Sequence, residues 1–114
     1  LAAGASLVII TRGAQGAEAW HKRAGSVAVA APAGPVMDTI GAGDSFQAAL
    51  LFALQAMGRC DASSLAGIGA DELRRALSFA ARCAAITCSR PGADPPRRAE
   101  IAADLAGFLA SRPA

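Results

Sequence analysis

The sequence predicts an α/β protein in which short strands come first and helices follow. Apolar residues in the first third of the chain run continuously or alternate with polar ones, a pattern typical of strands. From Asp44 onward they recur at three- and four-residue steps, the spacing of one helix face. The 114 residues, 54% hydrophobic and 18% charged, suffice for one core. We therefore expect a single domain over residues 1–114.

The strand signal lies in three apolar segments separated by turns. SLVIITRGAQGAEAW, residues 6–20, contains a β-branched run, a turn with glycine and a second, alternating run. HKRAG forms the next turn, and SVAVAAP, residues 26–32, supplies a third strand. Pro32 ends this strand, because proline has no N–H to donate to a sheet.

Three helices are predicted after the strands. The first extends from Asp44 to Met57, ahead of Gly58, and the second begins at Asp71 after a loop of small residues. TCSRPGADPPRR, residues 87–98, is expected to be irregular because prolines cannot continue a helix, and a last helix follows over residues 98–111. The expected apolar stripes are Phe46, Leu50, Leu51, Leu54 and Met57; Leu73, Leu77, Ala80, Ala81 and Ala84; and Ile101, Leu105, Phe108 and Leu109.

Charge and cysteine content exclude several classes of protein. The formal net charge is +2 and no basic cluster exceeds an adjacent arginine pair, so neither nucleic acid nor a membrane surface is expected as a partner. Cys60, Cys83 and Cys88 lack the spacing of a zinc site or a disulfide framework, which favours a reducing cytoplasm. No apolar run approaches the roughly 20 residues of a membrane span.

Four side chains of types that often bind ligands or catalyse reactions are predicted to be structural or solvent-exposed instead. His21 lies in a polar turn and is expected to be a solvated imidazole. Trp20 ends a strand and is expected to be partly buried against the sheet. Cys83 and Cys88 flank apolar helix positions and are expected to be small core residues.

The first residues carry a further expectation about the extent of the chain. It opens without methionine, on what resembles the tail of a helix that runs into a strand, so we expect part of a larger protein. Such a piece would expose an unpaired sheet edge. We therefore expect either self-association into a homo-oligomer or cover by a missing N-terminal segment.

The sequence VMDTIGAGDSFQAAL, residues 36–50, holds the strongest functional signal. Gly41, Ala42 and Gly43 separate Asp38 from Asp44 and lead directly into the first predicted helix. The first turn of a helix carries N–H groups without intrahelical partners and a partial positive charge, so it binds anions. The stretch lacks the third glycine of a dinucleotide fingerprint and the Lys-Ser/Thr pair of a Walker loop. What remains is an anion cradle with a carboxylate inside it.

Phosphoryl transfer would use both parts of this turn. Its N–H groups would stabilise the charge on a transferring phosphoryl group, and Asp44 would accept the proton of the attacking hydroxyl. The alternative without chemistry is that Asp44 only complements the helix dipole and that Gly41 and Gly43 are ordinary turn residues.

The longer match DTIGAGDSF, residues 38–46, resembles the C-terminal signature of the ribokinase-like carbohydrate kinases, also called the phosphofructokinase B family, whose pattern is D-T-x-G-A-G-D-x-F. VIITRGAQG, residues 8–16, and AAITCSRPGADPP, residues 84–96, resemble family segments beside the nucleotide and near the adenine and cation sites. The resemblance covers essentially the whole chain. It implies the C-terminal third of a kinase domain with a three-layer α/β/α sandwich, here the edge of a mostly parallel sheet with three helices.

The resemblance assigns roles to individual positions. Asp44 corresponds to the catalytic base, within an anion hole formed by Gly41, Ala42, Gly43 and Asp44. The positions that match the nucleotide-binding residues are Thr11, Gly13 and Gly16, together with Gly43 and Asp44. Ala81 stands where many relatives place an asparagine near the adenine, so that contact is not carried over.

A monovalent-cation site is also implied by the resemblance. Asp38 matches its acidic member, and backbone carbonyls complete it, those of Ile40, Thr87, Arg90 and Gly92. A hard cation prefers oxygen ligands, and a loop rich in proline and glycine leaves carbonyl groups without helix hydrogen bonds. Pro96 departs from the serine that some relatives offer there. The alternative for Asp38 is an Asx-turn with the next residues.

The function implied by the resemblance is transfer of a phosphoryl group from ATP to a sugar hydroxyl, with Mg2+ on the phosphates and K+ as a second cation. The segment of residues 84–96 is most similar to bacterial fructokinases, so fructose is the expected substrate. Ribose, a 2-keto-3-deoxy sugar acid or a nucleoside are alternatives within the family. An alternative of another class is a truncated module that binds nucleotide without turnover, and we expect no appreciable activity from the 114 residues alone.

Overall fold

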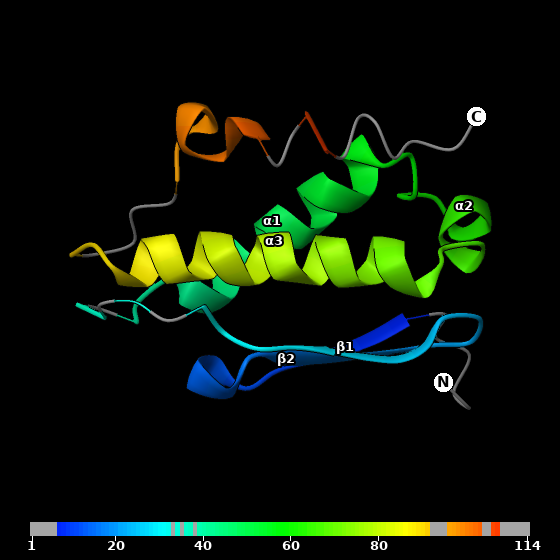
Figure 1. The fold of residues 1–114 in the computed structure, drawn as a ribbon, viewed down its shortest axis with the longest axis horizontal. Coiled ribbons are helices and arrows are strands. Elements are labelled where there is room, and N and C mark those ends of the chain that lie inside the picture. The colour runs from blue at the N-terminus through cyan, green and yellow to red at the C-terminus, as the bar shows by residue number, and fades with distance from the viewer. Residues whose placement is uncertain are drawn as a thin grey trace.

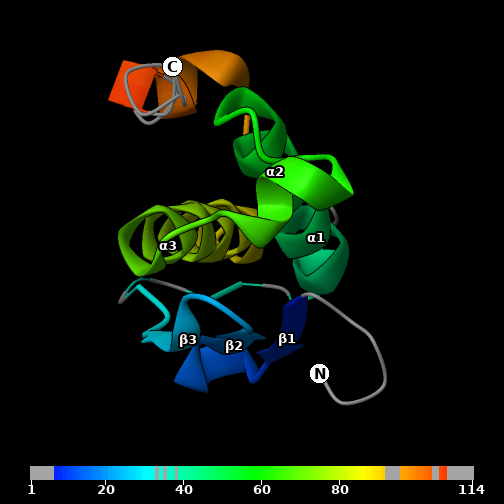
Figure 2. The ribbon, with the colours of Figure 1, turned by 90° about the vertical axis from the view of Figure 1, so that its right-hand side faces the viewer.

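The computed structural model describes residues 7–32, 34, 36–37, 39–91, 96–103 and 106–107. Helices α1 and α3 lie side by side on one face of a small sheet, as Figures 1 and 2 show. The elements, in chain order, are β1 (Leu7–Thr11), η1 (Gly13–Gln15), β2 (Ala17–His21), β3 (Gly25–Val29), α1 (Ala42–Ala56), α2 (Ala62–Ala66), α3 (Ala70–Cys88) and η2 (Arg98–Ile101). The predicted order of strands followed by helices is confirmed.

The three described strands pair in the order β1-β2-β3, and both pairs are antiparallel. In the register, Ile9 faces Ala19, and Ala19 faces Val27. The expectation of a mostly parallel sheet does not hold for this part of the chain. Only a few residues connect each strand to the next, and such short connections join antiparallel strands. Within the described residues the outer edge of β1 has no strand beside it, and self-association stays a prediction.

The core forms where the inner face of the sheet meets α1 and α3. Alternate residues of β2 point toward the helices, so Ala17 and Ala19 are buried while Trp20 is half-buried on the other face, as expected. The largest core side chains contributed by the helices are Phe46, Leu50, Leu54, Met57, Leu73, Leu77 and Phe79. Leu51 is an exception to the predicted stripe: its exposed fraction is 59%, because α1 contacts the rest of the molecule over a narrower face.

Helix boundaries depart from the predicted ones in three places. The loop predicted between the first two helices contains the five-residue helix α2, whose first turn is capped by Asp61. Helix α3 continues through Cys88, so Thr87 and Cys88 are helical rather than irregular. The last predicted helix begins as the 3-10 turn η2, with helical residues at 102–103 and 106–107. Leu105, Phe108 and Leu109 of its stripe lie outside the described residues.

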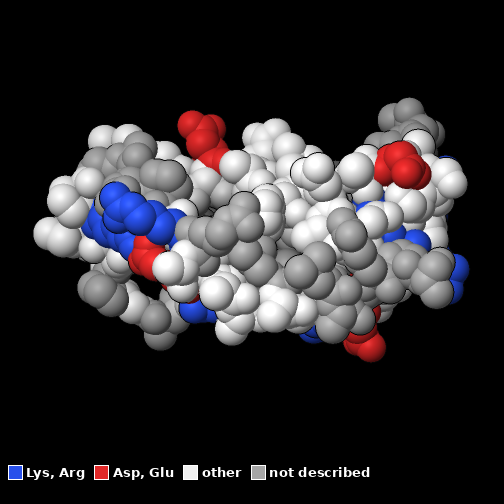
Figure 3. Space-filling view, turned by 90° about the horizontal axis from the view of Figure 1, so that it is seen from above, with Lys and Arg blue, Asp and Glu red and all other residues white. Residues whose placement is uncertain are grey.

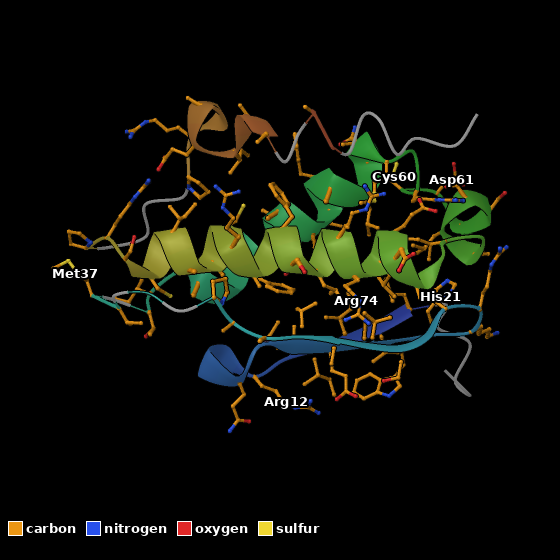
Figure 4. The ribbon with its side chains drawn as sticks, in the orientation of Figure 1. Arg12, His21, Met37, Cys60, Asp61 and Arg74 are labelled. Atoms are coloured by element: carbon orange, nitrogen blue, oxygen red, sulfur yellow. The ribbon has the colours of Figure 1, made fainter. Side chains whose placement is uncertain are left out.

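His21 is not solvated, which corrects the prediction for this residue. Its exposed fraction is 2%, and Figure 4 shows it between the β2–β3 hairpin and α2. Nδ1 accepts the backbone N–H groups of Arg23 and Ala24 at 3.1 and 3.0 Å, so the proton of the neutral ring is on Nε2, which donates to the Leu65 carbonyl at 2.9 Å. The imidazole therefore links α2 to the β2–β3 hairpin, over which α2 folds back.

None of the helices in the described ranges has the length and apolar character that crossing a bilayer requires. Cys83 is buried, as predicted, and Cys88 is partly buried.

Candidate active site

The segment that carries the motif forms a tight turn that opens directly into α1. Ala42 donates its N–H to the carbonyl of Thr39 at 3.2 Å, and Gly41 has φ 81° and ψ 0°. These angles at the third position define a type II turn, which favours glycine because a side chain there is strained. The carbonyl of Gly41 then accepts the N–H of Ser45 at 2.9 Å and starts the helix.

Two N–H groups at the start of α1 remain available to a ligand. Within the described residues, nothing accepts a hydrogen bond from the backbone N–H of Gly43 or Asp44. Gly41 is the N-cap and has no side chain that could accept one. The helix dipole places partial positive charge at the same point. The backbone here therefore offers two N–H groups to an anion, whereas the Ala42 N–H of the predicted anion hole is already used by the turn, and the anion hole itself stays a prediction.

The two glycines of the turn are required for different reasons. Gly41 adopts a positive φ, whereas Gly43 is helical, and a Cβ built on Gly43 would meet nothing within 4 Å. Among the described residues, therefore, no packing contact requires Gly43 to lack a side chain. Asp44, one residue further, is exposed in the first turn of α1. Open space over Gly43 and an exposed carboxylate beside it leave room for a group to approach the free N–H groups.

The last turn of α3 holds both ends of this segment. On one side, Met37 donates its N–H to the Cys88 carbonyl at 2.7 Å. On the other, the Thr87 hydroxyl lies 2.9 Å from the hydroxyl of Ser45, and both side chains are buried. Residues on both sides of the motif, Met37 and Ser45, therefore bond to the same end of α3.

The predicted nucleotide turn lies at the end of the sheet where α1 begins (Figure 1). Thr11 is exposed at the end of β1, and Gly13 has φ 56° with open space over it. Gly16 is different: at φ 90°, a Cβ there would lie 2.0 Å from the carbonyl oxygen of Val29. Packing of β3 against the turn explains Gly16 without a ligand, so Gly13 is the glycine of this turn that remains open to one.

Comparison with known proteins identifies the family. The family model described as pfkB family carbohydrate kinase matches residues 1–100. The chain belongs to this family. A search of curated protein sequences found no match.

Solved structures of kinases of this kind share the fold. Aminoimidazole riboside kinase from Salmonella enterica, complexed with aminoimidazole riboside and an ATP analogue, is 33% identical over 93% of this chain, with a TM-score of 0.66. An uncharacterized sugar kinase from Pyrococcus horikoshii is 28% identical over 93% of this chain, with a TM-score of 0.70. Fructokinase from Vibrio cholerae O395, with fructose, ADP and calcium ion bound, is 29% identical over 91% of this chain, with a TM-score of 0.61.

This pfkB-family chain spans about a third of the length of those structures, 32%, 32% and 30% respectively. These matches confirm that the chain is part of a ribokinase-like α/β fold, and its place at the C-terminal end of that fold stays a prediction. Figure 2 shows that the helices cover a single face of the described sheet.

Three of the five residues of the predicted cation site of this pfkB-family chain, Ile40, Thr87 and Arg90, lie within the described part of the chain. Asp38 and Gly92 lie outside the described residues. The bond from Met37 to Cys88 holds the chain just before Asp38 against the end of α3, between Thr87 and Arg90. The Thr87 carbonyl also accepts the N–H of Arg90 at 3.3 Å. Within the described ranges, no three His, Cys, Asp or Glu side chains are grouped as metal ligands.

Arginine side chains near this end form internal contacts. Seen from the side of η2, Figure 3 shows basic and acidic atoms together at the end of the molecule where α3 finishes. Arg90 forms an ion pair with Glu100. The N–H of Arg97 also donates to this carboxylate at 2.8 Å, and these contacts hold the pKa of Glu100 below its ordinary value, the N–H of Arg97 contributing most. The acid thus ties η2 to the end of α3.

Sequence reasoning missed the hydroxyl pair of Ser45 and Thr87. A signal was present, because Ser45 stands four residues before Ala49 and Thr87 four residues after Cys83, both on buried helix faces. A hydroxyl on an apolar stripe needs a partner. The helical spacing alone does not predict that Ser45 and Thr87 contact each other.

Proposed function

We propose that this chain supplies the catalytic turn of a kinase that transfers the γ-phosphoryl group of ATP to a hydroxyl of a sugar. The observation that carries the proposal is the start of α1, where two N–H groups that have no acceptor among the described residues adjoin the exposed carboxylate of Asp44. An anion site and a base within one helical turn bring the electrophile and the nucleophile together, which is most of what phosphoryl transfer requires.

Asp44 acts as the general base in this proposal. The sugar hydroxyl loses its proton to the Asp44 carboxylate as its oxygen forms a bond to the γ-phosphorus. The bond between that phosphorus and the oxygen bridging it to the β-phosphate breaks, and ADP leaves with the electron pair. The N–H groups of Gly43 and Asp44 stabilise the charge on the transferring group. Gly41 and Ala42 contribute by forming the turn that aims those groups.

ATP and cations are the cofactors of the proposed reaction. Thr11 ends β1 and Gly13 begins η1, and this turn lies at the sheet end where α1 begins (Figure 1), so its backbone suits the approach of phosphates. Mg2+ bound to the phosphates would neutralise their charge. Carbonyl oxygens of Ile40, Thr87 and Arg90, with Asp38 and Gly92, are the proposed K+ ligands, supported by the bond that joins Met37 to Cys88. None of the three cysteines, all within the described residues, forms a disulfide, and this supports a cytoplasmic location as part of the proposal.

Fructose is the proposed substrate, with a riboside as the second candidate. The fructokinase with bound fructose supports the first, at 29% identity, and the aminoimidazole riboside kinase supports the second, at 33% identity. A panel of fructose, ribose, a 2-keto-3-deoxy sugar acid and ribosides, each tested with ATP, separates the candidates. The native protein that contains these residues is the material for this assay.

The decisive experiment is Asp44→Asn in that native protein, with turnover and ATP affinity measured separately. We expect kcat to fall by at least about 100-fold, because general-base catalysis contributes about 10²–10⁴-fold, while the Kd for ATP changes little. Asp71→Asn is the matched control, since Asp71 is an exposed acid in the first turn of α3. If Asp44 only complements the helix dipole, both variants will keep their turnover, and the proposal fails.

The alternative of a module that binds nucleotide without turnover has its own result. In that case the wild-type protein binds ATP, but no compound of the panel is phosphorylated. The 114 residues alone are expected to behave in this way, because they span about a third of the related kinases.

A further inference from the structure

We propose that Ser45 and Thr87 are positioning residues, a hydroxyl pair that sets the direction in which the first turn of α1 presents its free N–H groups. The inference rests on the proposed function, because it concerns the same turn. Neither side chain touches the proposed phosphoryl group, since both are buried between α1 and α3.

The pair is part of a compact polar cluster inside the core. Thr87 Oγ1 lies 2.9 Å from Ser45 Oγ and 3.1 Å from the carbonyl oxygen of Cys83. Ser45 Oγ lies 3.4 Å from the same carbonyl. The exposed fractions of Ser45 and Thr87 are 7% and 1%. Hydrogen bonds between buried groups are directional and shielded from water, so they fix geometry in a way that apolar contacts do not.

The start of α1 needs an external anchor because it has no local one. Its N-cap is a glycine without a capping side chain, and a second glycine follows at position 43. By contrast, Asp61 caps α2 by accepting the N–H of Ser64 at 2.7 Å. Two glycines leave the backbone of the turn conformationally free. Ser45, the residue after Asp44, is the first polar side chain of α1 that is fixed to another element.

Satisfying a buried hydroxyl does not by itself explain the pair. Thr87 has an acceptor within its own helix, the Cys83 carbonyl one turn earlier, as threonines in helices commonly do. Ser45 is 3.4 Å from that carbonyl, a long hydrogen bond, and its close partner is Thr87. Ser45→Ala would therefore leave Thr87 with an acceptor and still cut the link between the helices. This substitution therefore tests the positioning role without leaving the Thr87 hydroxyl unsatisfied.

The test compares four variants of the native protein that contains these residues. Ser45→Ala and Thr87→Val remove the link, Thr87→Ser keeps the hydroxyl, and Ser64→Ala is the control, because Ser64 Oγ donates to the Asp61 carbonyl at 3.2 Å in α2. We expect the first two to lower kcat about tenfold with little change in the KM for ATP, since a misplacement of reacting groups by about 1 Å costs about 10²-fold and a smaller shift costs less. Ser64→Ala should keep wild-type kcat, and Thr87→Ser should recover most of the kcat that Thr87→Val loses.

A second readout follows the turn itself. Selective ¹⁵N-glycine labelling reports the amide resonance of Gly43, which is remote in sequence from Thr87. We expect Thr87→Val to shift this resonance and Thr87→Ser to restore it. Thr87→Val that lowers the melting temperature but leaves the Gly43 resonance and kcat as in Ser64→Ala would overturn the inference. If the wild-type protein phosphorylates nothing, the proposed function fails, whereas the Gly43 resonance still decides the positioning role.

Discussion

Met37 donates its backbone N–H to the carbonyl oxygen of Cys88 at 2.7 Å, and the bond attaches the segment before α1 to the end of α3. Figure 4 shows Met37 beside that helix end. Because Thr87 also contacts Ser45, one turn of α3 borders both sides of the motif. The end of α3 thus holds the candidate active site in place. Substitutions at the glycines of the two turns, residues 41–43 and 13–16, can distinguish effects on ligand binding from effects on stability.

Gly43→Ala should separate binding from stability. A Cβ at this helical position meets nothing within 4 Å, so we expect the free energy of unfolding to stay the same or rise by up to about 1 kcal/mol. The same methyl group would cover the free N–H groups, and ATP-dependent turnover should fall. Urea denaturation and kinase assays measure the two effects. Gly41→Ala is the contrast: at φ 81° it should destabilise the fold by about 1–2 kcal/mol. Full turnover in Gly43→Ala would argue that no ligand approaches this backbone.

Gly16→Ala should destabilise the protein more than Gly13→Ala, although both glycines lie in one turn. At Gly16 the new Cβ would lie 2.0 Å from the Val29 oxygen at a φ of 90°, so we expect a loss of more than about 2 kcal/mol. Gly13 has open space, and only its φ of 56° opposes alanine, at about 1 kcal/mol. Thermal denaturation of both variants tests this order. Equal losses would mean that β3 does not pack against the turn as described.

His21→Ala should destabilise the protein by about 2 kcal/mol. The substitution removes a buried ring and leaves the N–H groups of Arg23 and Ala24 without their acceptor, whereas the Leu65 carbonyl loses one donor and keeps the N–H of Ile68. Lys22→Ala, exposed in the same turn, should change stability by no more than about 0.5 kcal/mol. Chemical denaturation provides the values. A loss as small as that of Lys22→Ala would show that the imidazole does not hold the hairpin to α2.

The contribution of Asp61 to stability should depend on pH. The N–H of Ser64 holds the pKa of this carboxylate below its ordinary value. A depressed pKa in the folded state stabilises the protein above the ordinary aspartate value, about 4, and the effect is lost as the pH falls through that value toward the folded pKa. The melting temperature of Asp61→Ala should therefore be lower than that of the wild type near neutral pH, and the difference should shrink below about pH 4. Asp61→Asn keeps a neutral acceptor, so the difference between its melting temperature and that of Asp61→Ala should not depend on pH. A wild-type advantage over Asp61→Ala that persists unchanged in acid would contradict the assignment.

The candidate site was predictable from the sequence where local rules apply. The turn at Gly41 and the helix after it follow from a motif in which a glycine must adopt a positive φ. The stripe of α1 was correct at Phe46 and Leu54, because helical periodicity is a property of neighbouring residues, but it failed at Leu51, which no partner covers. The hydrogen bonds of His21 could not be predicted, since its position in a polar hairpin turn indicates solvent unless α2 is known to fold over it.

The sequence by itself determined the order of the elements, the family and the turn that offers free N–H groups, because backbone conformation at glycine, helical period and a nine-residue motif are all encoded between close neighbours. Only the tertiary structure decided that Thr87 meets Ser45, that Met37 bonds to Cys88 and that Gly16 lies directly against the Val29 carbonyl of β3. These contacts join segments far apart in the chain. Their partners depend on how the helices pack on the sheet, which no local pattern specifies.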